Sequence, residues 1–186
     1  TIAQACKDAN IPVVFINREM DGYEYPENQC YVGADARQSG TYQGEIIRDL
    51  ADKGDLNGDG KVSYIMIMGD PENSDAQYRT EFSIKALTDA GIEVDCLFQQ
   101  TGNWDQAQGQ ELVANALNKE GDKVEVVFCN NDGMALGALQ AINAAGRKVG
   151  EDIYLVGVDA LDEAVANVIE GTFTGTVLND AHGQAY

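Results

Sequence analysis

The sequence is poor in basic residues and has no long apolar run. It has 12 lysine and arginine residues against 31 aspartate and glutamate residues, a formal net charge of −19. Such a surface repels phosphate backbones and anionic lipid headgroups, so we expect no nucleic-acid partner and no membrane-surface partner. No stretch approaches the ~20 consecutive apolar residues of a spanning helix, and residues 1–10 lack the regions of a signal peptide. We therefore expect a mature or truncated chain.

Motifs of catalytic chemistry are also missing. The chain has no G-x-S-x-G, no G-x-x-x-x-G-K-[ST] and no H-E-x-x-H, and its single histidine is His182. A glycosidase needs two carboxylates at a fixed separation. Asp75 and Asp159 are candidates, but the sequence does not fix their separation, and both are better suited to accept hydrogen bonds from hydroxyl groups. We expect a binding protein, not an enzyme.

The four cysteines, Cys6, Cys30, Cys96 and Cys129, do not form a metal-binding pattern. Their spacing is irregular, and a single histidine cannot complete a Cys/His set, so zinc is not expected. Cys96 and Cys129 lie inside apolar runs, which favours buried free thiols over a disulfide.

Apolar residues make up 44% of the chain and alternate between strand and helix patterns. Nearly continuous apolar runs at 13–16, 64–68, 124–128 and 153–158 are typical of strands covered on both faces. The expected elements are helix 1–9, strand 12–16, strand 30–33, helix 39–53, strand 62–69, helix 74–90, strand 92–98, helix 104–119, strand 124–129, helix 132–146, strand 153–158, helix 161–171 and strand 175–178. This order predicts an α/β fold with a doubly wound, mostly parallel sheet.

Two helices have apolar stripes that we expect to face the core. One stripe contains Tyr42, Ile46, Ile47 and Leu50, and the other contains Met134, Leu139 and Ile142. The organisation changes near residues 33–37, and the chain ends where a further helix is expected. These features predict part of a larger protein.

Polar side chains follow nearly every expected strand. Ligands of open α/β sheets bind beyond the carboxyl ends of the strands, so these residues are candidates for a site. They are Asn17, Arg18, Asp70, Asn73, Asp75, Arg79, Gln99, Gln100, Trp104, Asn130, Asn131, Asp132, Asp159, Asn179 and Asp180. Helix capping is the alternative for each Asn and Asp, and a core position is the alternative for Trp104. Together they favour a site whose amides, carboxylates and guanidinium bind adjacent hydroxyls while an indole covers the C–H face.

Residues 55–63, Asp-Leu-Asn-Gly-Asp-Gly-Lys-Val-Ser, match positions 1 to 9 of an EF-hand calcium loop. Met66 at the twelfth position cannot ligate. Glu125 is the candidate for the missing carboxylate, because a charged residue inside an apolar strand is costly unless it is paired or coordinated. We predict a structural calcium site, with an Asx turn as the alternative.

The residues also resemble a known family, the periplasmic D-galactose/D-glucose-binding proteins of bacterial ABC transporters and chemotaxis. The matching segments are 11–17, 55–63, 74–80, 104–108, 125–132, 157–161 and 175–181. The resemblance implies a type I periplasmic-binding clamshell, present here as a fragment. Residues 1–34 and 179–186 would be remnants of the first lobe, and 35–178 would be the second lobe, with hinges near Gly33 and Leu178.

The resemblance also implies roles for individual residues. Sugar hydroxyls would be bound by Asn17, Asp75, Arg79, Asn131, Asp159 and Asn179, with Trp104 stacking on the ring and Asn73 replacing the family's histidine. Calcium would be held by Asp55, Asn57, Asp59, the Lys61 carbonyl, Ser63 and Glu125.

The implied function is extracytoplasmic capture of glucose or galactose. Expected partners are the monosaccharide, a transporter permease and, as a further option, a chemoreceptor, with a monomeric full-length protein. The alternative from another class is the effector-sensing domain of a sugar-responsive, LacI-type transcription repressor.

Overall fold

The computed structural model describes residues 1–20 and 22–185. Its main sheet has five parallel strands in the spatial order β4-β3-β5-β6-β7. Their bounds are β3 (Lys61–Met68), β4 (Glu93–Thr101), β5 (Val126–Cys129), β6 (Tyr154–Asp159) and β7 (Gly175–Leu178). The chain proceeds from β3 to one edge at β4 and then returns to the other side through β5. The strand order therefore reverses between β3 and β5, where doubly wound folds bind ligands.

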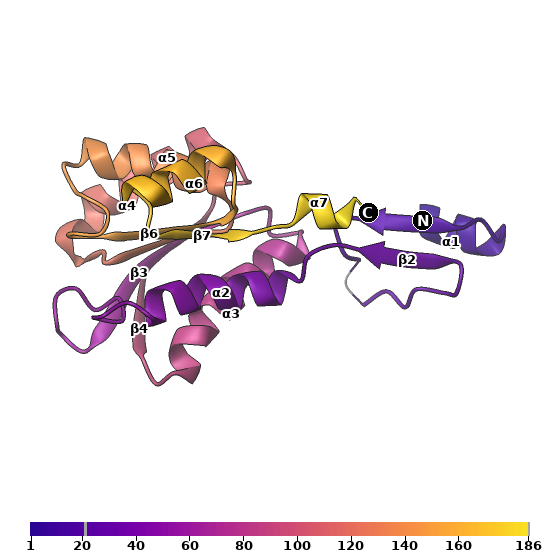
Figure 1. The fold of residues 1–186 in the computed structure, drawn as a ribbon, viewed down its shortest axis with the longest axis horizontal. Helices are drawn as coiled ribbons and strands as arrows, with labels where there is room; N and C mark the ends of the chain where they lie inside the picture. The colour runs from indigo at the N-terminus through magenta and orange to yellow at the C-terminus, as the bar shows by residue number, and fades with distance from the viewer. Residues whose placement is uncertain (21, 186) are drawn as a thin grey trace.

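Helices cover both faces of this sheet (Figure 1). One face carries α2 (Ala36–Arg48) and α3 (Ser74–Asp89), and the other carries α4 (Gln106–Glu120), α5 (Asp132–Ala144) and α6 (Asp162–Glu170). A single 3-10 turn (Gly121–Lys123) connects α4 to β5. The doubly wound α/β fold expected from the sequence is confirmed.

Alternate residues of the central strands supply the two cores. Val62, Tyr64 and Met66 of β3 pack into the core under α2 and α3, whereas Ile65 and Ile67 pack into the core under α4 and α5. This is the period of two that a strand imposes on its side chains. The result is a sheet buried on both faces, as the continuous apolar runs predict.

A smaller part of the molecule lies at the other end of its long axis (Figure 1). It contains α1 (Ile2–Asp8), the parallel pair β1 (Val13–Ile16) and β2 (Gln29–Val32), and the short α7 (Ala181–Gln184). The chain passes between the two parts just after β2 and just after β7, next to the expected hinges at Gly33 and Leu178. The division into lobes at residues 34/35 and 178/179 stays a prediction.

Several expected boundaries and positions are wrong in detail. Helix α2 begins at Ala36, three residues early, because the Asp35 side chain accepts a hydrogen bond from the Arg37 N–H and caps the helix. Strand β4 continues to Thr101, because residues 99–101 still pair with β3. Tyr42 is 46% exposed and does not belong to the core stripe.

All four cysteines are free thiols, but only one of the two expected to be buried is so. Cys129 lies on the central strand β5 and is buried, whereas Cys96 is exposed. Cys96 lies on β4, an edge strand of the main sheet, where strand neighbours cover only one side.

Within residues 1–20 and 22–185, no helix has the length and apolar character needed to cross a membrane.

Phe128 is a fully buried side chain of β5 and tests this account of the core. We expect Phe128→Ala to lower the free energy of unfolding by about 3–5 kcal/mol, because it removes apolar contacts and leaves a cavity. The control is Ile169→Ala on α6, where the side chain is 81% exposed. It is expected to change stability by less than about 0.5 kcal/mol. Urea denaturation of both variants measures the difference, and equal losses would contradict the core assignment.

Candidate functional site

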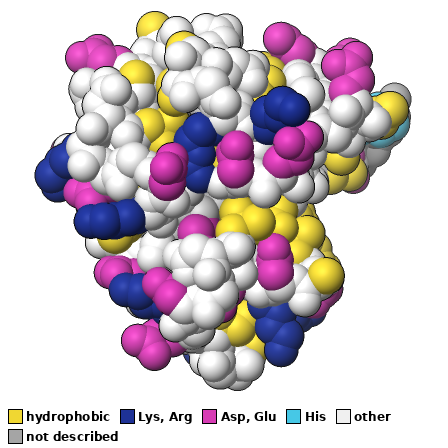
Figure 2. Space-filling view, turned by 90° about the vertical axis from the view of Figure 1, so that its left-hand side faces the viewer, with side chains coloured by type: hydrophobic (Ala, Val, Ile, Leu, Met, Phe, Trp, Pro, Cys, Tyr) yellow, Lys and Arg dark blue, Asp and Glu magenta, His cyan; other side chains and the backbone are white. Residues whose placement is uncertain are grey.

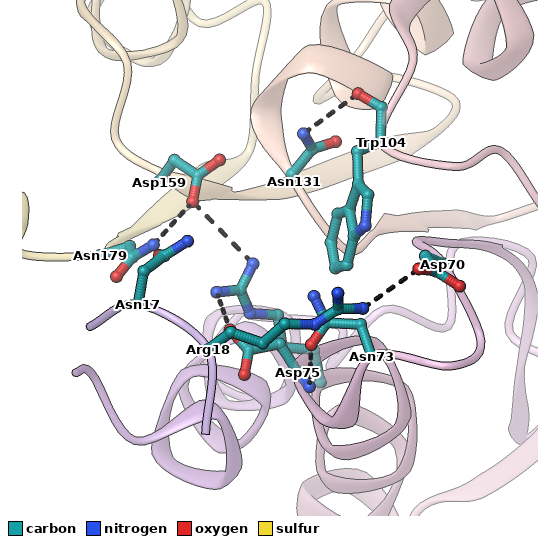
Figure 3. A pocket seen from close by; sticks show the side chains of 10 residues that line it. Asn17, Arg18, Asp70, Asn73, Asp75, Trp104, Asn131, Asp159 and Asn179 are labelled. Atoms are coloured by element: carbon teal, nitrogen blue, oxygen red, sulfur yellow. Dashed lines mark hydrogen bonds and ion pairs between the residues drawn. The ribbon is translucent and has the colours of Figure 1, made fainter. Parts of the chain in front are cut away.

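One cavity of about 520 Å³ opens at the carboxyl ends of the strands (Figure 3). All eight residues proposed for sugar binding line it. Its lining consists of Asn17, Arg18, Asp70, Asn73, Asp75, Arg79, Trp104, Asn131, Asp159 and Asn179. Asn17 and Arg18 come from the smaller part of the molecule, after β1, and the other residues follow strands or begin helices of the larger part. The site is therefore built between the two parts.

Arg79 is the buried charge at the centre of the cavity wall. Its side chain is only 5% exposed, and its Nη2 lies 3.2 Å from Asp75 Oδ2. Nη1 donates to the Asn130 carbonyl at 2.9 Å and lies 3.9 Å from Asp159 Oδ1. Two carboxylates and a carbonyl thus compensate the guanidinium, which a buried charge requires.

The Nε of Arg79 has no protein hydrogen-bond partner in the described part of the chain, although it is buried. A buried donor without a partner is costly, so this N–H adds to the free-energy cost of burying the guanidinium.

The two carboxylates beside Arg79 are set for hydrogen bonding to a neutral ligand. Burial raises the pKa of Asp75 and of Asp159, and the nearby Arg79 charge partly opposes the rise at both. Asp159 also accepts a hydrogen bond from Asn179 Nδ2 at 3.2 Å. Ionised carboxylates accept hydrogen bonds only, so the pair favours ligands that donate, such as hydroxyl groups.

Two amides of the cavity also cap helices. Asn73 Oδ1 accepts the Asp75 N–H at 3.0 Å at the start of α3, and Asn131 Oδ1 accepts the Met134 N–H at 3.0 Å at the start of α5. Asn73 and Asn131 thus each cap a helix and also line the cavity. With the oxygens committed to the caps, the amide N–H groups remain, and Asn131 Nδ2 donates one of its two to the Trp104 carbonyl at 3.3 Å.

Trp104 also has both of the environments expected for it, the ligand site and the core. Its ring lines the cavity and also packs against the core under α4 and α5. The indole lies against Gly69 so closely that a Cβ there would be 2.2 Å from a ring atom. Glycine is required for this approach.

Backbone strain is concentrated around the cavity. Asn17 has φ 66°, Trp104 has φ 66° and Asp159 has φ 126°, in a region that non-glycine residues seldom adopt. At Asn17 the carbonyl accepts a hydrogen bond from the Tyr31 hydroxyl at 3.3 Å, which fixes the strained residue. Such strain is typical of sites where side chains must be aimed at a ligand.

The loop 55–63 lies apart from this cavity, at the opposite end of β3. Asp55 accepts hydrogen bonds from the N–H groups of Gly58, Asp59 and Gly60, at 2.8 to 3.1 Å. Glu125, only 1% exposed, accepts one from the Asn57 N–H at 2.9 Å and one from the Ser63 N–H at 2.8 Å. The structure thus brings the Glu125 carboxylate to the loop, as predicted.

The loop contains the oxygen donors that Ca²⁺ prefers: two aspartates, an asparagine, a serine and a backbone carbonyl, with Glu125 beside them. Within residues 1–20 and 22–185, however, no group of three Asp, Glu, His or Cys side chains lies close enough together to hold a metal ion. The carboxylates of Asp55 and Glu125 face backbone N–H groups instead. The donor chemistry fits calcium, and the calcium site stays a prediction.

Arg18 and Asp70 were candidates from the sequence, but the resemblance implied no role in sugar binding for either of them. They line the cavity and form an ion pair, with Arg18 Nη2 3.1 Å from Asp70 Oδ2. Their positions two residues after the ends of β1 and β3 had marked them as candidates.

A two-part α/β structure with a polar cavity at its topological switch point has the architecture of a solute-binding protein. The chain belongs to the periplasmic binding protein family, because the model described as "Periplasmic binding protein domain" matches residues 1–186. It is 40% identical over 190 residues to a D-galactose/methyl-galactoside binding periplasmic protein of Haemophilus influenzae, covering 99% of this chain and 56% of that protein. It is 36% identical to a putative rhizopine-binding protein of Rhizobium meliloti, covering 98% and 57%.

Solved structures of solute-binding proteins also align with this chain. An ABC transporter solute-binding protein from Bacillus halodurans with bound myo-inositol aligns at a TM-score of 0.84 with 31% identity, covering 98% of this chain and 59% of that chain. A galactofuranose-binding protein aligns at 0.81 with 25% identity, covering 92% and 56%. These relatives are named as binding proteins, in line with the expectation that this chain is not an enzyme. The chain spans about 56% of the length of the Haemophilus influenzae protein.

The raised pKa of Asp159 predicts how stability depends on pH. At pH values just above the ordinary pKa of 3.8, Asp159 keeps its proton in the folded state and loses it in the unfolded state. The folded state therefore binds more protons, and the free energy of unfolding falls as the pH rises from 3.8 through the raised pKa. Asp159→Asn removes the titration. We expect the unfolding free energy of the variant, minus that of the parent protein, to increase from pH 3.5 to pH 7. Urea denaturation at both values measures this difference, and a constant difference would contradict the burial effect.

Proposed function

We propose that this chain is part of an extracytoplasmic receptor that captures a hexose, glucose or galactose, for an ABC transporter. The observation that carries the proposal is the convergence of eight polar or aromatic residues on one cavity, around a buried arginine between two carboxylates. Adjacent ring hydroxyls need paired donors and acceptors, and the indole supplies an apolar surface for C–H groups.

The relatives support a cyclic polyol as the ligand class. Their names include galactose, myo-inositol and galactofuranose, all of which present several hydroxyls on a small ring. The 40% identity to a galactose-binding protein favours a hexose over the other rings. It also favours transport over the sensing domain of a transcription repressor.

The proposed cycle has no chemical step. The sugar would bind between the two parts of the molecule and stabilise a closed form by hinge motion at the connections near Gly33 and Leu178. A transporter permease would recognise the closed form, and a chemoreceptor is a further partner in this proposal.

Calorimetric titration of the full-length protein with galactose, glucose, ribose, xylose and myo-inositol tests the ligand. We expect the tightest binding for galactose or glucose. Trp104→Ala should weaken it by about 2 kcal/mol, roughly 30-fold, because it removes a buried aromatic contact.

Two controls accompany this titration. Trp104→Phe keeps an aromatic face and should lose less affinity. Tyr42→Ala removes an exposed ring that does not line the cavity and should leave affinity unchanged. Absence of heat with both hexoses would contradict the proposal.

We also propose a structural calcium at residues 55–63, held by Asp55, Asn57, Asp59, the Lys61 carbonyl, Ser63 and Glu125. The proposal is supported by the D-x-N-x-D-G spacing and by the location of a buried carboxylate beside the loop. Its role would be to fix the turn that leads into β3, away from the cavity.

Metal removal tests this site. A ligand that binds only the folded state adds about 2.7 kcal/mol of stability at 100 times its Kd, so a chelator should lower the melting temperature and added Ca²⁺ should restore it. Glu125→Gln should melt at a lower temperature and respond weakly to the chelator. Asp89→Asn, an exposed change on α3, should respond as the parent protein does. A melting temperature that the chelator leaves unchanged would contradict the site.

A further inference from the structure

Two charged side chains line the cavity without belonging to the expected sugar ligands. Arg18 Nη2 lies 3.1 Å from Asp70 Oδ2, and the side chains are 53% and 39% exposed. By contrast, the Arg79 and Asp75 side chains are 5% and 14% exposed. The pair is therefore the more exposed part of the cavity lining, and Figure 3 shows the contact between its two side chains.

The ion pair joins the two parts of the molecule. Arg18 follows β1 of the small sheet, whereas Asp70 follows β3 of the main sheet, 52 residues later. The pair therefore connects the small part of the molecule to the main sheet at the lining of the cavity.

Two neighbouring contacts hold the same segment. The Ser74 hydroxyl donates to the Glu19 carbonyl at 3.4 Å, and Arg37 Nη1 lies 3.9 Å from Glu19 Oε2. The Arg37 guanidinium in turn lies 3.7 Å from the centre of the Tyr78 ring. Residues 17–19 thus supply Asn17 to the cavity and make two polar contacts with the β3–α3 region and a third with α2.

We propose that Arg18 and Asp70 form a latch that slows the release of bound ligand by holding the cavity closed. The inference rests on the proposed function, because it concerns the same cavity. The two residues act as positioning residues: they hold the Asn17 segment against the start of α3 and need no contact with the ligand. An exposed ion pair is weak and is screened by salt, so we expect an effect on the dissociation rate constant of about two- to five-fold.

Stopped-flow displacement of D-galactose from the full-length protein tests the latch. Arg18→Met and Asp70→Asn should each raise the dissociation rate constant about two- to five-fold, with a smaller change in the association rate constant. The charge-exchanged double variant, Arg18→Asp with Asp70→Arg, should restore slow release. Raising NaCl to 1 M should speed release from the parent protein but not from the double variant Arg18→Met with Asp70→Asn.

The matched control is the exposed ion pair between Lys85 and Asp89 on α3, 2.7 Å long and outside the cavity lining. Lys85→Met should leave both rate constants unchanged. The latch is wrong if the single variants release galactose at the parent rate, if association and dissociation accelerate equally, or if the charge exchange does not restore slow release. The last result would assign Arg18 to direct ligand contact. Failure of the parent protein to bind either galactose or glucose would instead contradict the proposed function itself.

Discussion

The buried guanidinium of Arg79 is the interaction on which the cavity depends. A charge that is 5% exposed needs compensation, and Asp75, Asp159 and the Asn130 carbonyl supply it from three different segments of the chain. These groups must therefore stay close together for the fold to remain stable. The same requirement keeps two carboxylates in the lining of the cavity.

One glycine and one buried amide fix the surroundings of Arg79. A Cβ at Gly40 would lie 2.9 Å from the Arg79 Cα, so glycine lets α2 approach α3 at this point. Asn130, fully buried, accepts the Gly69 N–H at 3.0 Å and donates to the Thr80 hydroxyl at 3.1 Å. The loop that supports Trp104 and the helix that carries Arg79 are thereby joined through one amide. Sheet topology brings the residues together, and these contacts fix their orientation.

The fold and the membership of the cavity were largely predictable, because both follow from local pattern. Continuous apolar runs define covered parallel strands, and parallel strands bring their carboxyl ends to one edge, so Asn131 and Asp159 are neighbours although 28 positions separate them in the sequence. The details that failed depend on tertiary surroundings. Exposure of Cys96 depends on the position of β4 at the sheet edge, and pairing of Arg18 with Asp70 depends on how the small sheet sits against the large one. The surface itself, with mixed basic and acidic side chains across the face in Figure 2, gives no comparable guide.

Asn131 both caps a helix and lines the cavity, which limits the substitutions that evolution can make at this position. Its Oδ1 caps α5 while the residue lines the cavity, so a substitution that changes ligand preference also changes the stability of a helix. Loss of such a cap costs about 0.5–2 kcal/mol, which is a large share of the stability of an ordinary domain. Aspartate, serine and threonine keep the cap and alter the donors, so they are the mutational routes open at this position. Asn17 caps no helix in the described part of the chain, so the constraint there is its φ of 66°, which favours asparagine or glycine.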